Sequence, residues 1–138
     1  MRIFLDANIL FSAAKSDGAI RHLVGRLFAT GHTCCVDEYV VAEARRNLHL
    51  KNAEALDDFD VLLRKLKMVD ALAYSAVVSS NLDWLLEKDR PVLHAAMRSR
   101  CDILVTCDRR HFGAGYGRTF GGVTLHSPRM LAEFFDLG

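Results

Sequence analysis

The sequence predicts a single domain, residues 1–138, that folds as a three-layer α/β/α sandwich around a mostly parallel central sheet. Three observations support this fold class. Short apolar runs typical of buried strands alternate with longer segments whose apolar residues recur at helical spacing. The apolar fraction of 51% fits a compact core, and the chain has the length of one ordinary domain. No repeat or linker interrupts this alternation.

The first half of the chain contains two short apolar runs and four segments with helical periodicity. The runs indicate buried strands, because a strand covered on both faces needs no alternation of polar residues. The periodic segments indicate amphipathic helices that pack one face against the sheet. The expected elements are a strand at 2–5, helices over 8–14 and 19–30, a strand at 33–36, and helices over 38–50 and 53–66.

The second half is less regular but carries clear helix starts. Pro91 suits the first turn of a helix, and Ser127 followed by Pro128 suits the start of the last one. Five glycines between residues 113 and 122 indicate a long loop. The expected elements are a strand within 68–78, a short helix over 80–87 that carries Trp84, a helix over 92–98, strands at 102–106 and 123–125, and a helix over 129–135.

Composition and cysteine spacing exclude several classes of protein. No apolar run reaches membrane-spanning length, and Asp6 interrupts the N-terminal run, so we expect a cytoplasmic protein without a membrane segment. The net charge of +1 does not indicate a partner. No pair of cysteines has the spacing of a zinc site, and all four are interpreted as buried, reduced thiols: Cys34, Cys35, Cys101 and Cys107.

Four acidic residues are placed to meet at one edge of the predicted sheet. Asp6 and Asp108 follow two buried strands directly, and the carboxyl ends of parallel strands share an edge. Glu43 lies on a helix that follows a strand, and Asp89 precedes the helix that leads into strand 102–106. Crowded carboxylates repel one another unless they share a cation, and hard oxygen ligands suit Mg²⁺ or Mn²⁺. Such an ion can activate water against a phosphodiester.

A structural interpretation of these acids remains open at this point. An aspartate at the end of a strand often belongs to a turn or caps the next helix. We assign Asp17, Asp37 and Asp102 to that category. Spacing alone does not decide between a cap and a metal ligand for the other acids.

Three segments resemble the sequence motifs of the PIN-domain family, and together they span most of the chain. RIFLDANILFSA resembles the first motif, in which an Asp after the first strand precedes a small residue and Asn. VVAEARRNL resembles the second, with its helical Glu, and KDRPVLHAAMRSRCDILVTCDRRHFG resembles the third and fourth. The glycine-rich loop and the segment SPRMLAEF are similar to the ends of such proteins.

This resemblance implies an endoribonuclease that hydrolyses RNA phosphodiesters with Mg²⁺ or Mn²⁺. Many family members are toxins of bacterial toxin–antitoxin pairs of the VapC type, which implies an antitoxin protein and a homodimer as partners. Asn8 and Thr106 become hydrogen-bonding supports that orient the carboxylates. The acids carried over as catalytic metal ligands are Asp6, Glu43, Asp89 and Asp108.

The chain departs from the family pattern at two places. Cys107 stands where family members usually have Gly before the final Asp, which is expected to alter packing only. Lys88 and Arg90 flank Asp89, so an ion pair with one of them is an alternative for this acid when metal is absent. Asp89 is therefore the acid whose direct ligation of metal the sequence leaves open.

Residues near these acids suggest further contacts. A group of arginines surrounds the last strand–acid motif, and Arg109 and Arg110, next to Asp108, are the contacts we expect with RNA phosphates. His111 is interpreted as a packed or exposed loop histidine rather than as a proton-transfer group. The aromatic residues interpreted as core rather than base-stacking surfaces are Trp84, Tyr39 and Tyr74.

Two alternative functions compete with the nuclease. A catalytically weak PIN domain would act as an RNA-binding or protein-assembly module, yet such a module has little use for mutually repelling carboxylates. A receiver-like phosphotransfer domain also gathers acids at strand ends, but it needs a Lys after the last strand. No Lys follows VTLHSP here. The four acids therefore favour the nuclease.

Overall fold

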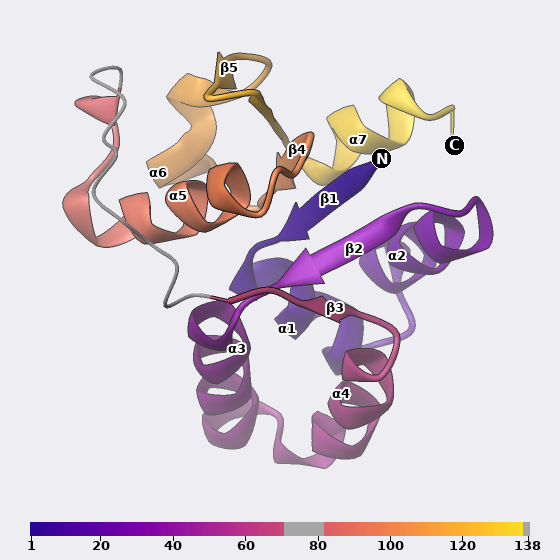
Figure 1. The fold of residues 1–138 in the computed structure, drawn as a ribbon. Coiled ribbons are helices and arrows are strands. Elements are labelled where there is room, and N and C mark those ends of the chain that lie inside the picture. The colour runs from indigo at the N-terminus through magenta and orange to yellow at the C-terminus, as the bar shows by residue number, and fades with distance from the viewer. Residues whose placement is uncertain (71–81, 137–138) are drawn as a thin grey trace.

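The computed structural model describes residues 1–70 and 82–136. In this part of the chain, six strands form one sheet in the order β3-β2-β1-β4-β6-β5 (Figure 1). The strands β5 and β6 pair antiparallel, and the other pairs are parallel, which confirms the mostly parallel sheet. The strands are β1 (Arg2–Leu5), β2 (Thr33–Val36), β3 (Lys67–Met68), β4 (Ile103–Val105), β5 (Thr119–Phe120) and β6 (Val123–His126).

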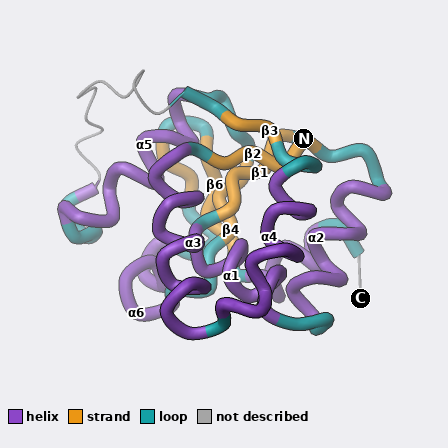
Figure 2. Tube along the Cα trace, turned by 90° about the horizontal axis from the view of Figure 1, so that it is seen from below, coloured by secondary structure: helices purple, strands orange, loops and turns teal. Residues whose placement is uncertain are grey.

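Helices connect the parallel strands and cover both faces of the sheet. From β1 the chain moves to β2 and then β3 on one side, whereas β4 and β6 lie on the other side of β1. Right-handed crossovers in opposite directions place their helices on opposite faces, and Figure 2 shows the strands in the middle of the molecule. The helices are α1 (Ala7–Lys15), α2 (Ala19–Ala29), α3 (Glu38–Lys51), α4 (Leu56–Leu63), α5 (Arg90–Arg98), α6 (Arg109–Phe112) and α7 (Pro128–Phe134). Short 3₁₀ turns are η1 (Ala53–Ala55), η4 (Glu87–Asp89) and η5 (Gly113–Gly115).

The core explains why the short strands form where the apolar runs lie. Ile3, Phe4 and Leu5 of β1 are completely buried, since β1 is a central strand covered on both faces. The helices α1, α3, α6 and α7 begin after polar residues whose side chains accept hydrogen bonds from the first turn. This was predicted for Ser127, whose Oγ accepts from the amide of Met130 at 3.1 Å. These strands and caps fix the positions of the residues that follow them.

Several predicted elements differ in the structure. The described residues 82–87 contain turns and the start of η4, so the helix expected over 80–87 is wrong in this part. Of the strand expected within 68–78, only Met68 belongs to β3, and residues 71–78, including Tyr74, lie outside the described residues. The unexpected strand β5 joins β6 through Gly121 and Gly122, both with positive φ, because a two-residue hairpin needs such angles.

Side-chain exposure confirms some expectations and corrects others. Trp84 is partly buried and packs against Phe120, with ring centroids 5.1 Å apart. Tyr39, however, is 46% exposed and does not belong to the core. Three cysteines are buried as expected, but Cys107 is exposed, because it lies between the end of β4 and α6. Among the described helices, none has the length and apolar character needed to cross a membrane.

Candidate metal centre

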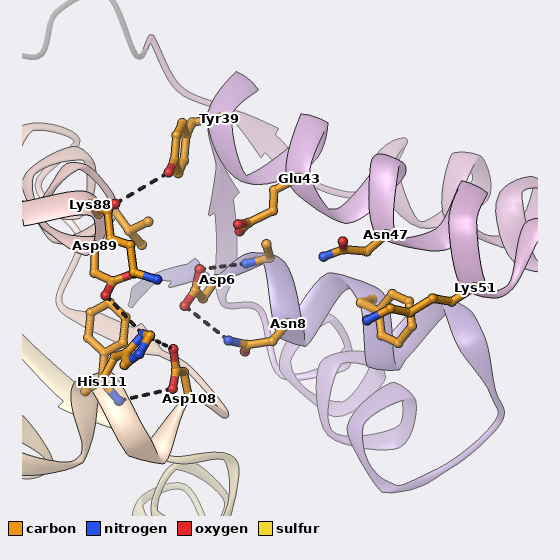
Figure 3. Close-up of a pocket in the computed structure, with 14 residues that line it drawn as sticks. Asp6, Asn8, Tyr39, Glu43, Asn47, Lys51, Lys88, Asp89, Asp108 and His111 are labelled. Carbon is orange, nitrogen blue, oxygen red and sulfur yellow. Dashed lines mark hydrogen bonds and ion pairs between the residues drawn. The ribbon is translucent and has the colours of Figure 1, made fainter. Parts of the chain in front are cut away.

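A cavity of about 340 Å³ lies where the strand order reverses, at the carboxyl ends of β1 and β4 (Figure 3). Helices that leave neighbouring strands toward opposite faces open a crevice at such a point. The amide of Asp6 donates to the carbonyl of Val105 at 3.1 Å, so the two strand ends stay side by side. The residues that directly follow β1 and β4 are therefore close to the cavity.

The structure brings together all four acids that the sequence singled out. Asp6 follows β1, Glu43 lies on α3, Asp89 ends η4 and Asp108 precedes α6, and all four line the cavity. In Figure 3 these side chains point toward a common space. Their convergence from four separate elements is a property of the fold, whereas their role as metal ligands stays a prediction.

Hydrogen bonds from both strand ends hold the Asp6 carboxylate in place. Its Oδ1 accepts from the amide of Ala7 at 2.8 Å, so Asp6 also caps α1. Its Oδ2 accepts from Thr106 Oγ1 at 2.8 Å and from Asn8 Nδ2 at 3.3 Å. Asn8 Oδ1 in turn accepts from the amide of Cys107 at 2.8 Å. Asn8 and Thr106 thus fix the direction of this carboxylate. Asp6 is therefore both the N-cap of α1 and a residue that lines the cavity.

The electrostatics of the cavity disfavour an unaccompanied cluster of carboxylates. Burial raises the pKa of Asp6 to about 6, although hydrogen bonds from Thr106 and Ala7 act in the opposite direction. The negative charges of Glu43 and Asp108 raise this pKa further. A carboxyl in this environment either holds a proton or needs a nearby cation to stabilise its ionised form.

His111 is a site residue that the sequence interpretation missed. Its Nδ1 lies 3.1 Å from Asp89 Oδ2 and 3.0 Å from Asp108 Oδ2, so it is not an ordinary loop histidine. The alternative of an ion pair between Asp89 and Lys88 or Arg90 has no support among the described residues: the Asp89 carboxylate faces His111, and Arg90 Nε donates to the carbonyl of Leu85. The spacing of three residues between Asp108 and His111, within one helical turn, was the available signal.

The rim of the cavity carries polar residues to which the sequence interpretation gave no role. Asn47 and Lys51 follow Glu43 on α3 at intervals of four residues, so all three share one face of the helix. Lys88 and Lys51 lie at opposite ends of the cavity in Figure 3. The exposed Tyr39 also lines it, and its hydroxyl donates to the carbonyl of Lys88 at 3.5 Å.

The predicted RNA contacts lie outside the lining of this cavity. Arg109 and Arg110 are exposed on α6, directly after Asp108. Their side chains face solvent at the edge of the site, so contact with a bound polynucleotide stays a prediction. Lys51 and Lys88 are the lysines that line the cavity itself.

The donor set fits a divalent cation. Four carboxylates converge, and the buried Oδ2 of Asp89 lacks a hydrogen-bond donor of suitable geometry within the described part of the chain. Carboxylate oxygens are the ligands that Mg²⁺ and Mn²⁺ bind most often. Asp89, Asp108 and His111 also offer ligand atoms within 4.8 Å of one another. The cavity therefore has both the charge and the ligand atoms for a metal ion.

Comparisons with known proteins agree with this architecture. A family model described as PIN domain matches residues 2–110. Two solved structures share the fold: VapBC2 from Rickettsia felis bound to a DNA fragment from their promoter, and DNA-bound VapBC from Salmonella typhimurium. The first has a TM-score of 0.67 and 19% identity and covers 92% of this chain and 98% of its own. The second has a TM-score of 0.66 and 16% identity and covers 93% and 98%. No curated protein matches the sequence.

Proposed function

This chain belongs to the PIN-domain family, and from that premise we propose that it is a divalent-metal-dependent endoribonuclease that hydrolyses RNA phosphodiesters. The observation that carries the proposal is the convergence of four acidic side chains, from four elements, in one cavity. Burial of Asp6 together with neighbouring charges raises its pKa, so the cluster favours a positively charged ligand. Catalysis by a metal ion needs no serine or histidine nucleophile.

The residues of the cavity divide the work of binding and positioning. Asp6, Glu43, Asp89 and Asp108 would hold Mg²⁺ or Mn²⁺, which when bound supplies an activated water and offsets charge on the phosphate. Thr106 and Asn8 orient Asp6 through the hydrogen bonds at 2.8 and 3.3 Å. Hydrogen bonds to a metal ligand fix its direction, so Thr106 and Asn8 would support metal binding without contacting the ion.

Cations at the edge of the cavity would bind the phosphates of RNA. Lys51 and Lys88 line the two ends, and ammonium groups bind phosphates as point charges. Arg109 and Arg110 lie exposed next to Asp108 and would contact phosphates outside the cavity. These four residues would thus guide a strand past the acids.

We propose further that the protein is the toxin of a toxin–antitoxin pair in the cytoplasm, with an antitoxin protein as partner and a homodimer as its assembly. The support is the shared fold with one chain of each of two VapBC structures, of which 98% is covered in both cases. Co-expression with the product of a neighbouring small gene, followed by size-exclusion chromatography, tests this part. A monomeric protein that neither pairs with that product nor slows growth would contradict it.

The nuclease proposal is tested with purified protein, a broad panel of RNAs, and Mn²⁺, Mg²⁺ or EDTA. We expect cleavage with either metal ion and none in EDTA. The matched variants are Asp108→Asn, which removes a proposed ligand, and Asp102→Asn, which changes an aspartate that accepts a hydrogen bond from Arg2 instead. Binding of RNA without cleavage in any metal would favour the alternative module and contradict the enzyme.

A further inference from the structure

His111 and two of the acids form a compact set of ligand atoms on one wall of the cavity. Its Nδ1 lies 3.0 Å from Asp108 Oδ2 and 3.1 Å from Asp89 Oδ2. Side chains of both aspartates are largely shielded, with 18% exposure for Asp89 and 31% for Asp108. An imidazole nitrogen therefore lies beside two of the proposed metal ligands.

The backbone of α6 fixes this arrangement. Asp108 Oδ1 accepts from the amide of His111 at 3.1 Å, which closes the first turn of the helix. The second oxygen, Oδ2, is left to face the imidazole of His111. Residues three apart on one turn lie on the same face, so the pair is set by the local fold and not by a flexible side chain alone.

The distances match those of neighbouring ligands around one ion. Ligands about 2.1–2.2 Å from an octahedral ion lie about 3.0 Å apart when they are adjacent. The two nitrogen–oxygen distances at His111 have this value. Among the described residues, none offers a suitably aligned donor to the buried Oδ2 of Asp89, although this atom lies within ion-pair distance of His111. An ion between these atoms would satisfy it.

We propose that His111 Nδ1 is a direct metal ligand together with Asp89 and Asp108, and that it makes the site select Mn²⁺ over Mg²⁺. Imidazole nitrogen suits transition metals, whereas Mg²⁺ prefers carboxylate, carbonyl and water oxygens. This inference rests on the proposed metal-dependent function but goes beyond it, because it assigns both a new ligand and the class of ion.

An opposite role for His111 is a counter-ion that holds the two aspartates together and leaves when a metal ion arrives. The two roles predict different metal affinities. A ligand adds affinity, and more for Mn²⁺ than for Mg²⁺, while a displaced counter-ion competes with every cation. Replacement of His111 therefore lowers the affinity for Mn²⁺ in the first case and raises it in the second.

The experiment measures metal binding by the purified protein without RNA. Calorimetric titrations with Mn²⁺ and Mg²⁺ compare wild type with His111→Ala and His111→Gln. The control is His22→Ala, which removes an exposed histidine that pairs with Asp17 on the surface. We expect wild type and His22→Ala to prefer Mn²⁺. The His111 variants should lose at least about tenfold in Mn²⁺ affinity and less in Mg²⁺ affinity, since even outer contacts of metal ligands contribute tenfold or more.

Pulsed electron paramagnetic resonance of bound Mn²⁺ gives a second readout. A coordinated imidazole produces coupling to its nitrogen nucleus, which should be present in wild type and absent in both His111 variants. Unchanged or tighter Mn²⁺ binding by folded variants, or no nitrogen coupling in wild type, would overturn the inference. If wild type still cleaves RNA after such a result, the nuclease proposal stands and only the ligand role of His111 is overturned. If wild type binds no divalent ion, both proposals are overturned.

Discussion

Asp6 and Asp37 follow neighbouring parallel strands, and each caps the helix that begins after it. Both are buried, with 5% and 3% exposure, and burial raises the pKa of both carboxyls. Yet Asp6 lines the cavity, whereas Asp37 is not among the residues that line it. The same local pattern of strand, aspartate and helix therefore leads to two different roles.

Strand order accounts for this difference. β1 lies between β2 and β4, and the chain leaves β1 and β4 toward opposite faces of the sheet. β2 lies between β1 and β3, and its crossovers run in one direction, so the strand order does not reverse at its end. Asp37 accepts a hydrogen bond from the amide of Val40 at 3.0 Å, whereas the charges of Glu43 and Asp108 also act on Asp6.

The largest expected difference between the two aspartates is in RNA cleavage. Asp6→Asn should lower the initial rate in Mn²⁺ by at least about 10³-fold, equivalent to about 4 kcal/mol of transition-state stabilisation. Asp37→Asn should change it by less than about threefold, because Asn is an equally good cap. Initial cleavage rates of both variants on the same RNA substrate check this. Similar decreases in rate in both variants would mean that the two aspartates do not differ in function.

The next effect is on how the free energy of unfolding depends on pH when EDTA keeps the protein free of metal. Burial raises the pKa of Asp6 from its ordinary value of 3.8 to about 6 in the folded protein, so the folded state binds this proton more tightly. Its contribution to stability is full below about pH 4 and is lost as pH rises through 6, by about 3 kcal/mol in total. Denaturant unfolding of Asp6→Asn from pH 4 to pH 8 should lack this decline. A parallel decline in wild type and variant would assign the pH dependence to other groups.

A metal ion should separate the two variants again. Excess Mn²⁺ stabilises a folded protein that binds it, by about 2.7 kcal/mol at a free concentration one hundred times Kd. Wild type and Asp37→Asn should show this gain in thermal melts, and Asp6→Asn, with one proposed ligand removed, should show less. Equal gains in all three proteins would place the ion away from Asp6.

The smallest effect is loss of the helix cap at Asp37. Asp37→Ala should destabilise the protein by about 1 kcal/mol, because the amide of Val40 loses its acceptor. This cost should be the same in EDTA and in Mn²⁺. A loss of stability that differs between EDTA and Mn²⁺ would mean that Asp37 affects metal binding in the cavity.

Residues that follow central strands were predictable, because the strand signal and the parallel sheet together place them. This holds for Asp6 and Asp108. Because crossovers between parallel strands are right-handed, the position of the helix that carries Glu43 was predictable as well. The Gly121–Gly122 hairpin was also readable in principle, because adjacent glycines suit a turn with two positive φ angles. It was missed because three other glycines nearby indicated a single loop.

Other site residues depend on contacts between elements that sequence spacing does not determine. Tyr39 lies near apolar residues in the sequence, but in the structure it is 46% exposed and its hydroxyl lies 3.5 Å from the carbonyl oxygen of Lys88 in η4. His111 contacts Asp89 because the fold brings α6 next to η4, which is far from it in the sequence. Long-range pairing of this kind is a property of the packed fold and leaves no periodic pattern in the sequence.

Cys107 offers a route to follow the cavity by spectroscopy. Its amide donates to Asn8, so the backbone fulfils the structural role, while its thiol is exposed and the other three cysteines are buried. A fluorophore attached there would stand next to Asp108 without any engineered cysteine. Although Cys107 is exposed, partial desolvation of its sulfur and the charge of Asp6 raise the pKa of the thiol, so coupling with a maleimide should proceed faster in mildly alkaline buffer. The chain thus carries a single native position for a reporter dye at the edge of its acidic cavity.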